Sequence, residues 1–146
     1  MTNFSDRAAC PANAFSHRFD VPDSDIDDLG HAGNVSWVRW INEAAGAHSR
    51  SIGLDLPAYR TLGVIWVVRR HDVTYLAPAF ARETLDALTW VASARAATSL
   101  RRTCFYRAEG GALLARAETT WALLNLASGK PTRIPHDLMS RYGFTA

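Results

Sequence analysis

The hydrophobic period of this chain changes once near its beginning, and this change limits the folds that the chain can adopt. Apolar and polar side chains alternate over residues 15–21, which predicts a strand. Residues 34–52 instead carry apolar side chains at helical spacing, and Gly53 follows as a stop signal. The polar run 25–34 joins the two segments. The sequence therefore predicts a strand, a polar junction and one long helix, in that order.

Strand-like segments dominate the rest of the chain. They cover residues 64–75, 84–93, 98–108 and 112–126. Glu109-Gly110-Gly111 is a hairpin signal between the last two. Residues 54–62 are expected to form a connection that contains Pro57, and residues 136–142 a short terminal helix. One long helix beside five strands predicts an α+β fold with an antiparallel sheet that the helix covers.

Composition narrows the class of protein. The chain has 146 residues, 48% of them hydrophobic, which suits a single domain spanning residues 1–146 with a loose leader over 1–14. A formal net charge of +2 is too small to indicate nucleic-acid binding. No apolar run is long enough for a membrane span, and residues 1–13 do not resemble a signal peptide.

The cysteines and histidines do not indicate a metal site. Cys10 and Cys104 lie far apart in the sequence and form no metal motif, so both are expected to be thiols in a reducing cytoplasm. The histidines outside the polar run show no paired spacing. We therefore expect a cytoplasmic protein without a metal ion.

The polar run concentrates acids at the predicted start of the long helix. Asp25, Asp27 and Asp28 precede Gly30 and His31 there. Such residues are common in turns and helix caps, so a purely structural role is one interpretation. A carboxylate at this junction also faces the helix N-terminus, where unpaired N–H groups and the macrodipole favour negative charge. That geometry can support chemistry on a carbonyl group.

The spacing of this run resembles a known enzyme motif. Asp25-x-Asp27-x-x-Gly30-His31-x-x-Asn34, followed by an aromatic helix, resembles the motif of hot-dog-fold acyl-CoA thioesterases of the 4-hydroxybenzoyl-CoA thioesterase type. The motif covers about residues 17–53, and a weaker match continues to about Pro135. The resemblance implies a hot-dog fold and a thioester hydrolase that needs no cofactor. It also implies a homodimer or homotetramer in which sheets join and the sites lie at the subunit interface.

The resemblance assigns roles to the residues of the run. The acid that matches Asp27 is either a general base for water or a nucleophile, and both roles remain open. Backbone N–H groups near Asn34 would polarise the thioester carbonyl. His31 either assists the acid or is a buried histidine bonded to a loop carbonyl. Asp25 is expected to shape the turn and Asp28 to be solvated.

Arg101-Arg102 is the candidate site for the phosphates of coenzyme A. Arginine forks match phosphate oxygens, and the resembling enzymes often use basic residues on later strands. Adjacent strand residues face opposite ways, so one of the two is expected to reach the ligand. The alternative is a pair of solvated arginines on an edge strand. Arg69-Arg70 is a weaker candidate.

The chain departs from the resembling pattern within the long helix. Asn42 replaces an acid, and Gly46 interrupts the helix interior, where it could permit close packing against the sheet or a second helix. The tryptophans could line an acyl pocket or form core. They are Trp37, Trp40, Trp66, Trp90 and Trp121. The leading hypothesis is an acyl-CoA thioesterase, and the alternatives are an acyl-carrier-protein thioesterase and a non-catalytic acyl-thioester binding module.

Overall fold

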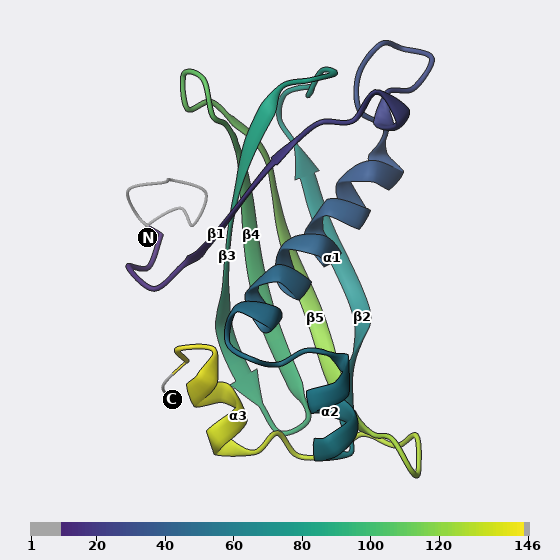
Figure 1. Ribbon diagram of the computed structural model, residues 1–146, viewed down its shortest axis with the longest axis vertical. Helices are drawn as coiled ribbons and strands as arrows, with labels where there is room; N and C mark the ends of the chain where they lie inside the picture. The colour runs from purple at the N-terminus through teal and green to yellow at the C-terminus, as the bar shows by residue number, and fades with distance from the viewer. Residues whose placement is uncertain (1–9, 145–146) are drawn as a thin grey trace.

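A five-stranded antiparallel sheet carries the long helix α1 (Asn34–Ser51) across one face (Figure 1). The computed structural model describes residues 10–144, so most of the expected leader lies outside the described residues. The strands are β1 (Phe15–Asp20), β2 (Val64–Tyr75), β3 (Thr84–Arg95), β4 (Thr98–Arg107) and β5 (Leu113–Asn125). Their order in the sheet is β1-β3-β4-β5-β2, which leaves β1 and β2 as the edges. The predicted α+β class and all five strands are confirmed.

Three short helical segments complete the described chain. They are the 3-10 turn η2 (Asp23–Asp25), α2 (Leu56–Leu62) and α3 (His136–Arg141). The prediction of a plain connection over 54–62 is wrong for α2, because Pro57 lies in the first turn of that helix, where it is tolerated. The Asp55 side chain caps α2 by accepting from the Ala58 amide at 2.9 Å. The predicted terminal helix is confirmed by α3.

The first half of α1 fills the space above the sheet with large side chains. Trp37, Trp40 and Ile41 are almost fully buried against small residues of the strands, among them Ala87 and Ala117. Large side chains on the helix thus meet small ones on the sheet, which allows close packing without voids. The interpretation of tryptophans as core holds for Trp37 and Trp40.

The second half of α1 carries small residues instead. Gly46 does not owe its place to close packing on the sheet, because the three atoms nearest to a Cβ placed there all belong to the Arg50 side chain of the same helix. Of the two roles expected for Gly46, close packing on the sheet is therefore wrong, and packing against a second helix stays a prediction. Below this half of the helix, α2 and α3 close the lower end of the sheet (Figure 1).

The opposite face of the sheet carries a separate apolar cluster built around Trp90, Cys104 and Tyr106. Cys10 packs against this cluster, and its sulfur lies 3.9 Å from the Tyr106 hydroxyl. The two cysteines are thiols rather than a disulfide, as the sequence predicts. Among residues 10–144, no helix is long and apolar enough to cross a bilayer.

Candidate active site

The polar run forms a tight loop between β1 and α1. The Asp27 amide donates to the His31 carbonyl at 2.9 Å, and the Gly30 amide donates to the Asp27 carbonyl at 3.0 Å. Gly30 has a backbone φ of +86°, a conformation that residues other than glycine rarely adopt. The loop therefore turns back on itself and brings Asp27 beside His31.

The carboxylate of Asp27 lies at the entrance to α1. One of its oxygens accepts from the Leu29 amide at 2.9 Å. A Cβ placed on Gly33 would lie 3.6 Å from its other oxygen, so this oxygen faces the residue that caps α1. The Asp27 side chain is 38% exposed, which leaves it accessible to a substrate.

The N-terminus of α1 has no side-chain cap, because Gly33 occupies the cap position. In the part of the chain that the structure describes, the amides of Asn34 and Val35 donate to no protein acceptor, whereas the next two amides bond to the Gly33 carbonyl. Unpaired first-turn amides together with the helix dipole favour an anion. The amides of Asn34 and Val35 could therefore stabilise negative charge that develops on a carbonyl oxygen.

His31 lies close to Asp27 without a hydrogen bond to it. Its Nδ1 is 4.0 Å from the carboxylate and 3.2 Å from the Ala32 carbonyl. Since a carbonyl only accepts, the Nδ1 nitrogen carries a proton that it donates to Ala32. The ring is bonded to a loop carbonyl, as the structural interpretation predicts, but it is half-exposed rather than buried.

An open hollow of about 370 Å³ lies beside these residues. His31, Asn34 and Trp37 form one side of it, and the residues that follow β2, Leu76 to Pro78, form the other. Ala32, together with Tyr75 at the end of β2, completes the lining. This hollow can admit a thioester group, and His31 and Asn34 line it. Asp27 does not line the hollow, but its carboxylate lies 4.0 Å from Nδ1 of His31.

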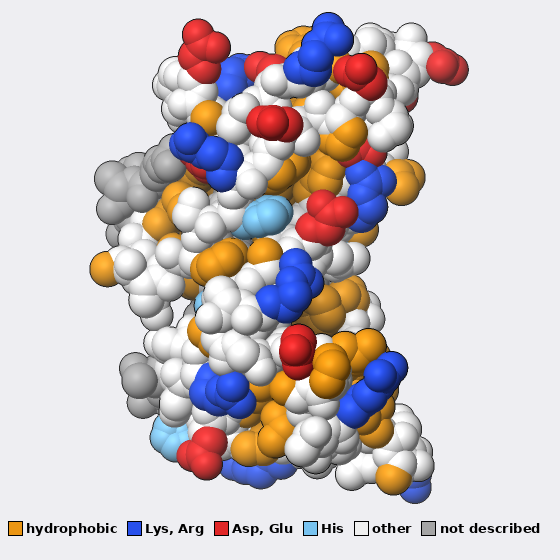
Figure 2. All heavy atoms as spheres, viewed as in Figure 1, with side chains coloured by type: hydrophobic (Ala, Val, Ile, Leu, Met, Phe, Trp, Pro, Cys, Tyr) orange, Lys and Arg blue, Asp and Glu red, His pale blue; other side chains and the backbone are white. Residues whose placement is uncertain are grey.

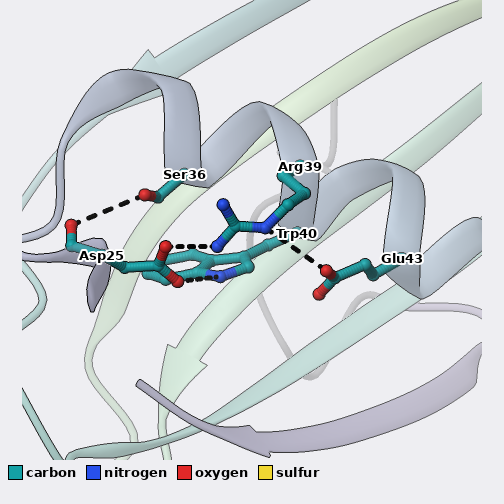
Figure 3. Close-up of polar contacts among 5 residues, drawn as sticks. All are labelled: Asp25, Ser36, Arg39, Trp40 and Glu43. Atoms are coloured by element: carbon teal, nitrogen blue, oxygen red, sulfur yellow. Dashed lines mark hydrogen bonds and ion pairs between the residues drawn. The ribbon is translucent and has the colours of Figure 1, made fainter. Parts of the chain in front are cut away.

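Asp25 holds the loop against α1 (Figure 3). Its buried carboxylate accepts from the Trp40 indole at 3.1 Å and pairs with the Arg39 guanidinium, which also contacts Glu43 at 3.4 Å. Its backbone carbonyl accepts from the Gly33 amide at 3.1 Å. Burial acts to raise the pKa of Asp25, but the hydrogen bonds and the charge of Arg39 outweigh it and lower the pKa. Asp25 therefore shapes the turn, as predicted.

The sequence pattern does not single out Arg39 and Trp40 as partners of Asp25. The spacing of Arg39 and Glu43 could have revealed a pair on one helix face, since residues four apart are neighbours there. The bond between Asp25 and the helix depends on how the loop folds back, which spacing alone does not give. Asp28, by contrast, is exposed, as predicted.

Arg101 and Arg102 point to opposite faces of the sheet, as strand alternation predicts. The alternative of solvated edge-strand arginines is wrong, because β4 lies in the middle of the sheet and Arg101 is only 5% exposed. Arg101 lies under α1 and bonds to His48 and Thr89, while Arg102 pairs with Glu118 at 3.3 Å. Neither arginine lines the hollow at the start of α1.

The described residues contain no group of three or more His, Cys, Asp or Glu side chains placed to hold a metal ion. The chemistry available to the loop is that of a carboxylate, an imidazole and backbone amides.

Comparison with protein families gives a match over nearly the whole chain. The model of the acyl-ACP thioesterase N-terminal domain matches residues 12–142. A comparison with curated protein sequences gives no match.

Solved structures with the same fold include several thioesterases. The 1,4-dihydroxy-2-naphthoyl-CoA thioesterase from Synechocystis has a TM-score of 0.81 at 21% identity, over 89% of this chain and 96% of that one. The DHNA-CoA thioesterase from Staphylococcus aureus has a TM-score of 0.80 at 19% identity, over 89% of each chain. A hypothetical protein from Staphylococcus aureus in complex with CoA has a TM-score of 0.81 at 15% identity, over 89% of this chain and 82% of that one. With the strand order, these likenesses confirm the predicted hot-dog fold.

Proposed function

The chain belongs to the acyl-ACP thioesterase N-terminal domain family, and from this premise we propose that it hydrolyses an acyl-CoA thioester at the start of α1. The observation that carries the proposal is the position of the Asp27 carboxylate against the uncapped helix N-terminus. This arrangement supplies a general base or nucleophile and an oxyanion site within one loop, and neither requires a cofactor.

The proposed chemistry places the thioester carbonyl oxygen at the amides of Asn34 and Val35. These donors and the helix dipole are oriented before negative charge develops on that oxygen, which favours the tetrahedral intermediate. Asp27 removes a proton from water, whose oxygen forms the new bond to the carbonyl carbon. When the carbon–sulfur bond breaks, the thiolate takes up this proton and leaves as coenzyme A.

The nucleophilic route is the alternative role for Asp27. In that route a carboxylate oxygen attacks the carbonyl carbon, the thiolate leaves, and water then hydrolyses the mixed anhydride. His31 is proposed as a positioning residue, since its protonated Nδ1 lies 4.0 Å from Asp27. A single turnover in water labelled with heavy oxygen distinguishes the two routes, because only the nucleophilic route can transfer the label to Asp27.

The identity of the thiol carrier is part of the proposal. The CoA-bound structural neighbour favours coenzyme A, whereas the description of the matching family favours an acyl carrier protein. Arg102 remains our candidate contact for nucleotide phosphates, because its side chain is 34% exposed. Arg101 is enclosed beneath α1, where a nucleotide does not fit.

We further propose that the working form is a homodimer or homotetramer. Several apolar side chains stay exposed around the candidate site, including Leu29, Val35 and Leu76. Figure 2 shows hydrophobic side chains exposed among charged ones on the face that carries α1. Exposed apolar groups around a polar site are typical of a surface that a partner or substrate covers.

The test is hydrolysis of aromatic, short-chain and long-chain acyl-CoA thioesters, followed by release of free thiol. Asp27→Asn should lower kcat by about a hundredfold or more, which is typical for loss of a general base. Asp28→Asn is the matched control, because it removes the exposed neighbouring carboxylate, and it should retain wild-type activity. If Asp27→Asn kept more than about a tenth of kcat, the role of Asp27 would be wrong.

The same panel presented on an acyl carrier protein distinguishes the alternatives. Turnover of carrier-bound substrates alone would assign the carrier protein as partner. Saturable binding of acyl thioesters without turnover by the folded wild-type protein would instead indicate a binding module.

A further inference from the structure

A second cavity, of about 190 Å³, lies between the second half of α1 and the sheet. It is separate from the hollow at the start of α1, and the two share no lining residue. Four aromatic side chains and one arginine are among the residues that line it. These are Tyr59, Trp66, Arg101, Trp121 and Tyr142.

The cavity exists because α1 changes character along its length. Where the first half of the helix presents Trp37 and Trp40, the second half presents Ala45 and Gly46, which cannot fill the same space. Asn42 is exposed and Gly46 half-buried at the helix side of the cavity, so ligands can enter along α1.

Arg101 lines this cavity with a buried positive charge. Its guanidinium has no acidic partner among the described residues. Its guanidinium donates to His48 Nδ1 and Thr89 Oγ1, each at 3.1 Å, and lies 5.5 Å from the centre of the Tyr142 ring. Burial lowers the pKa of Arg101 to about 10, yet the group remains protonated at neutral pH.

The groups around Arg101 are neutral. Arginine only donates, so Nδ1 of His48 must accept, and His48 is the neutral Nε2–H tautomer. Burial, followed by the charge of Arg101, lowers the pKa of His48 to about 4, in keeping with a neutral ring. Burial also raises the pKa of Tyr59, so its hydroxyl stays protonated. The positive charge therefore remains uncompensated within the described chain.

An unmatched buried charge is costly, and a protein normally neutralises or pairs it. A residue of the cavity wall also has a buried polar atom without a partner. The indole nitrogen of Trp121 is buried and makes no hydrogen bond in the described structure. A buried cation that lines an aromatic cavity points to a ligand with an anionic oxygen.

We propose that this cavity binds a small aromatic monocarboxylate, with its carboxylate on Arg101 and its ring among the aromatic walls. A cavity of about 150 Å³ is known to hold benzene, so this one accommodates a single ring with a carboxylate. It is too small for the nucleotide of coenzyme A. The proposal goes beyond thioester hydrolysis and does not depend on it, because the binding site lies away from Asp27.

The test is titration of the full chain with benzoate, followed by intrinsic tryptophan fluorescence and by calorimetry. Trp66 and Trp121 line the cavity, so occupancy should change the emission. A dissociation constant of about 1 mM or lower is expected for so small a ligand in an enclosed site. Benzamide has the same shape without the charge and should bind at least about tenfold more weakly. Saturation by benzamide at equal affinity, or no saturable response to benzoate, would overturn the proposal.

Two variants test the cavity itself, with circular dichroism to verify folding. Arg101→Met should lose benzoate affinity by about tenfold or more, whereas Arg82→Met, the same change on an exposed arginine, should not. Val91→Phe fills the cavity and leaves the charge in place, and it should also abolish binding. If Arg101→Met did not fold, Val91→Phe would decide the question. Wild-type affinity in either folded variant would show that benzoate binds elsewhere.

Discussion

His48 is a buried imidazole that the fold keeps neutral. It lies under α1, stacks on Phe15 at a centroid distance of 5.0 Å, and accepts a hydrogen bond from Arg101. Burial, then the charge of Arg101, lowers its pKa to about 4 from an ordinary 6.5. The unfolded chain therefore binds a proton between these two values while the folded chain does not. Protonation of the unfolded state makes the protein less stable as the pH falls.

We predict that the contribution of His48 to the free energy of unfolding is fully present above pH 6.5. The free energy of unfolding should then fall as the pH drops toward 4. One histidine with this pKa difference between the folded and the unfolded chain changes the free energy of unfolding by up to about 1.4 kcal/mol per pH unit. Urea denaturation across this pH range measures the slope. His71, whose pKa burial also lowers, adds to it in the same direction.

The control variants separate His48 from the other histidines. His48→Gln should flatten the profile, because the amide oxygen can still accept from Arg101 and does not titrate. His136→Gln changes an exposed histidine and should leave the slope unchanged. A wild-type slope in His48→Gln would mean that other groups cause the pH dependence.

Single residues of the candidate site differ in how far the sequence could predict them. Asp27 and Asn34 were predicted from the resemblance of the loop motif, and the structure brings both to the N-terminus of α1. Strand alternation also predicts that Arg101 and Arg102 face apart. It does not say which face α1 covers, so the burial of Arg101 against His48 could not be predicted.

The loop before α1 depends on a single buried anchor. Asp25 accepts from Trp40 and pairs with Arg39, and both partners lie within α1 (Figure 3). We predict that Asp25→Asn lowers the free energy of unfolding by about 1–3 kcal/mol, because charge-assisted bonds to a buried group are lost. It should also lower kcat several-fold, since the loop that holds Asp27 loosens. Denaturant unfolding and thiol release measure the two effects.

Glu43→Gln is the matched control for the anchor. Glu43 also pairs with Arg39, but both side chains are about half exposed, so its loss should change stability by less than about 1 kcal/mol. Equal effects of the two variants would show that the pairing with Arg39, rather than the burial of Asp25, holds the loop.

The elements themselves were largely predictable, because period and turn signals are local. Helix α1 and the five strands agree with the hydrophobic pattern to within a few residues. Helix α2 is the exception, since a proline in the first turn resembles a break. Its cap, Asp55, three residues before Ala58, is the signal that could have revealed it.

The arrangement of the whole molecule depends on contacts that no local pattern specifies. Strand β1 pairs with β3, and β5 lies between β4 and β2, so the sheet order does not follow the chain. The hot-dog arrangement was available only from the resemblance of the loop motif. The cavity beneath α1 likewise depends on α2 and α3, which close the end of the sheet.

The same sheet order leaves β2 as a long edge strand of 12 residues. An exposed edge of this length is a template for pairing with another strand. Arg70 and Asp72 lie near its middle with exposed side chains of opposite charge. Two antiparallel copies of the strand could therefore place unlike charges near each other. We propose this edge as the subunit interface of the homodimer.

We predict that light scattering after size exclusion gives about twice the chain mass of 16.1 kDa. Asp72→Arg makes this part of the edge uniformly positive, so it should shift the protein toward monomer. It should also lower thioesterase activity, because the family resemblance implies a site at the subunit interface. Glu109→Arg makes the same charge change in the exposed β4–β5 turn and should remain dimeric and active.

A wild-type protein that is monomeric at assay concentration would contradict the interface. A dimeric Asp72→Arg variant would place the interface on another surface, and the exposed apolar residues around the start of α1 would be the next to test.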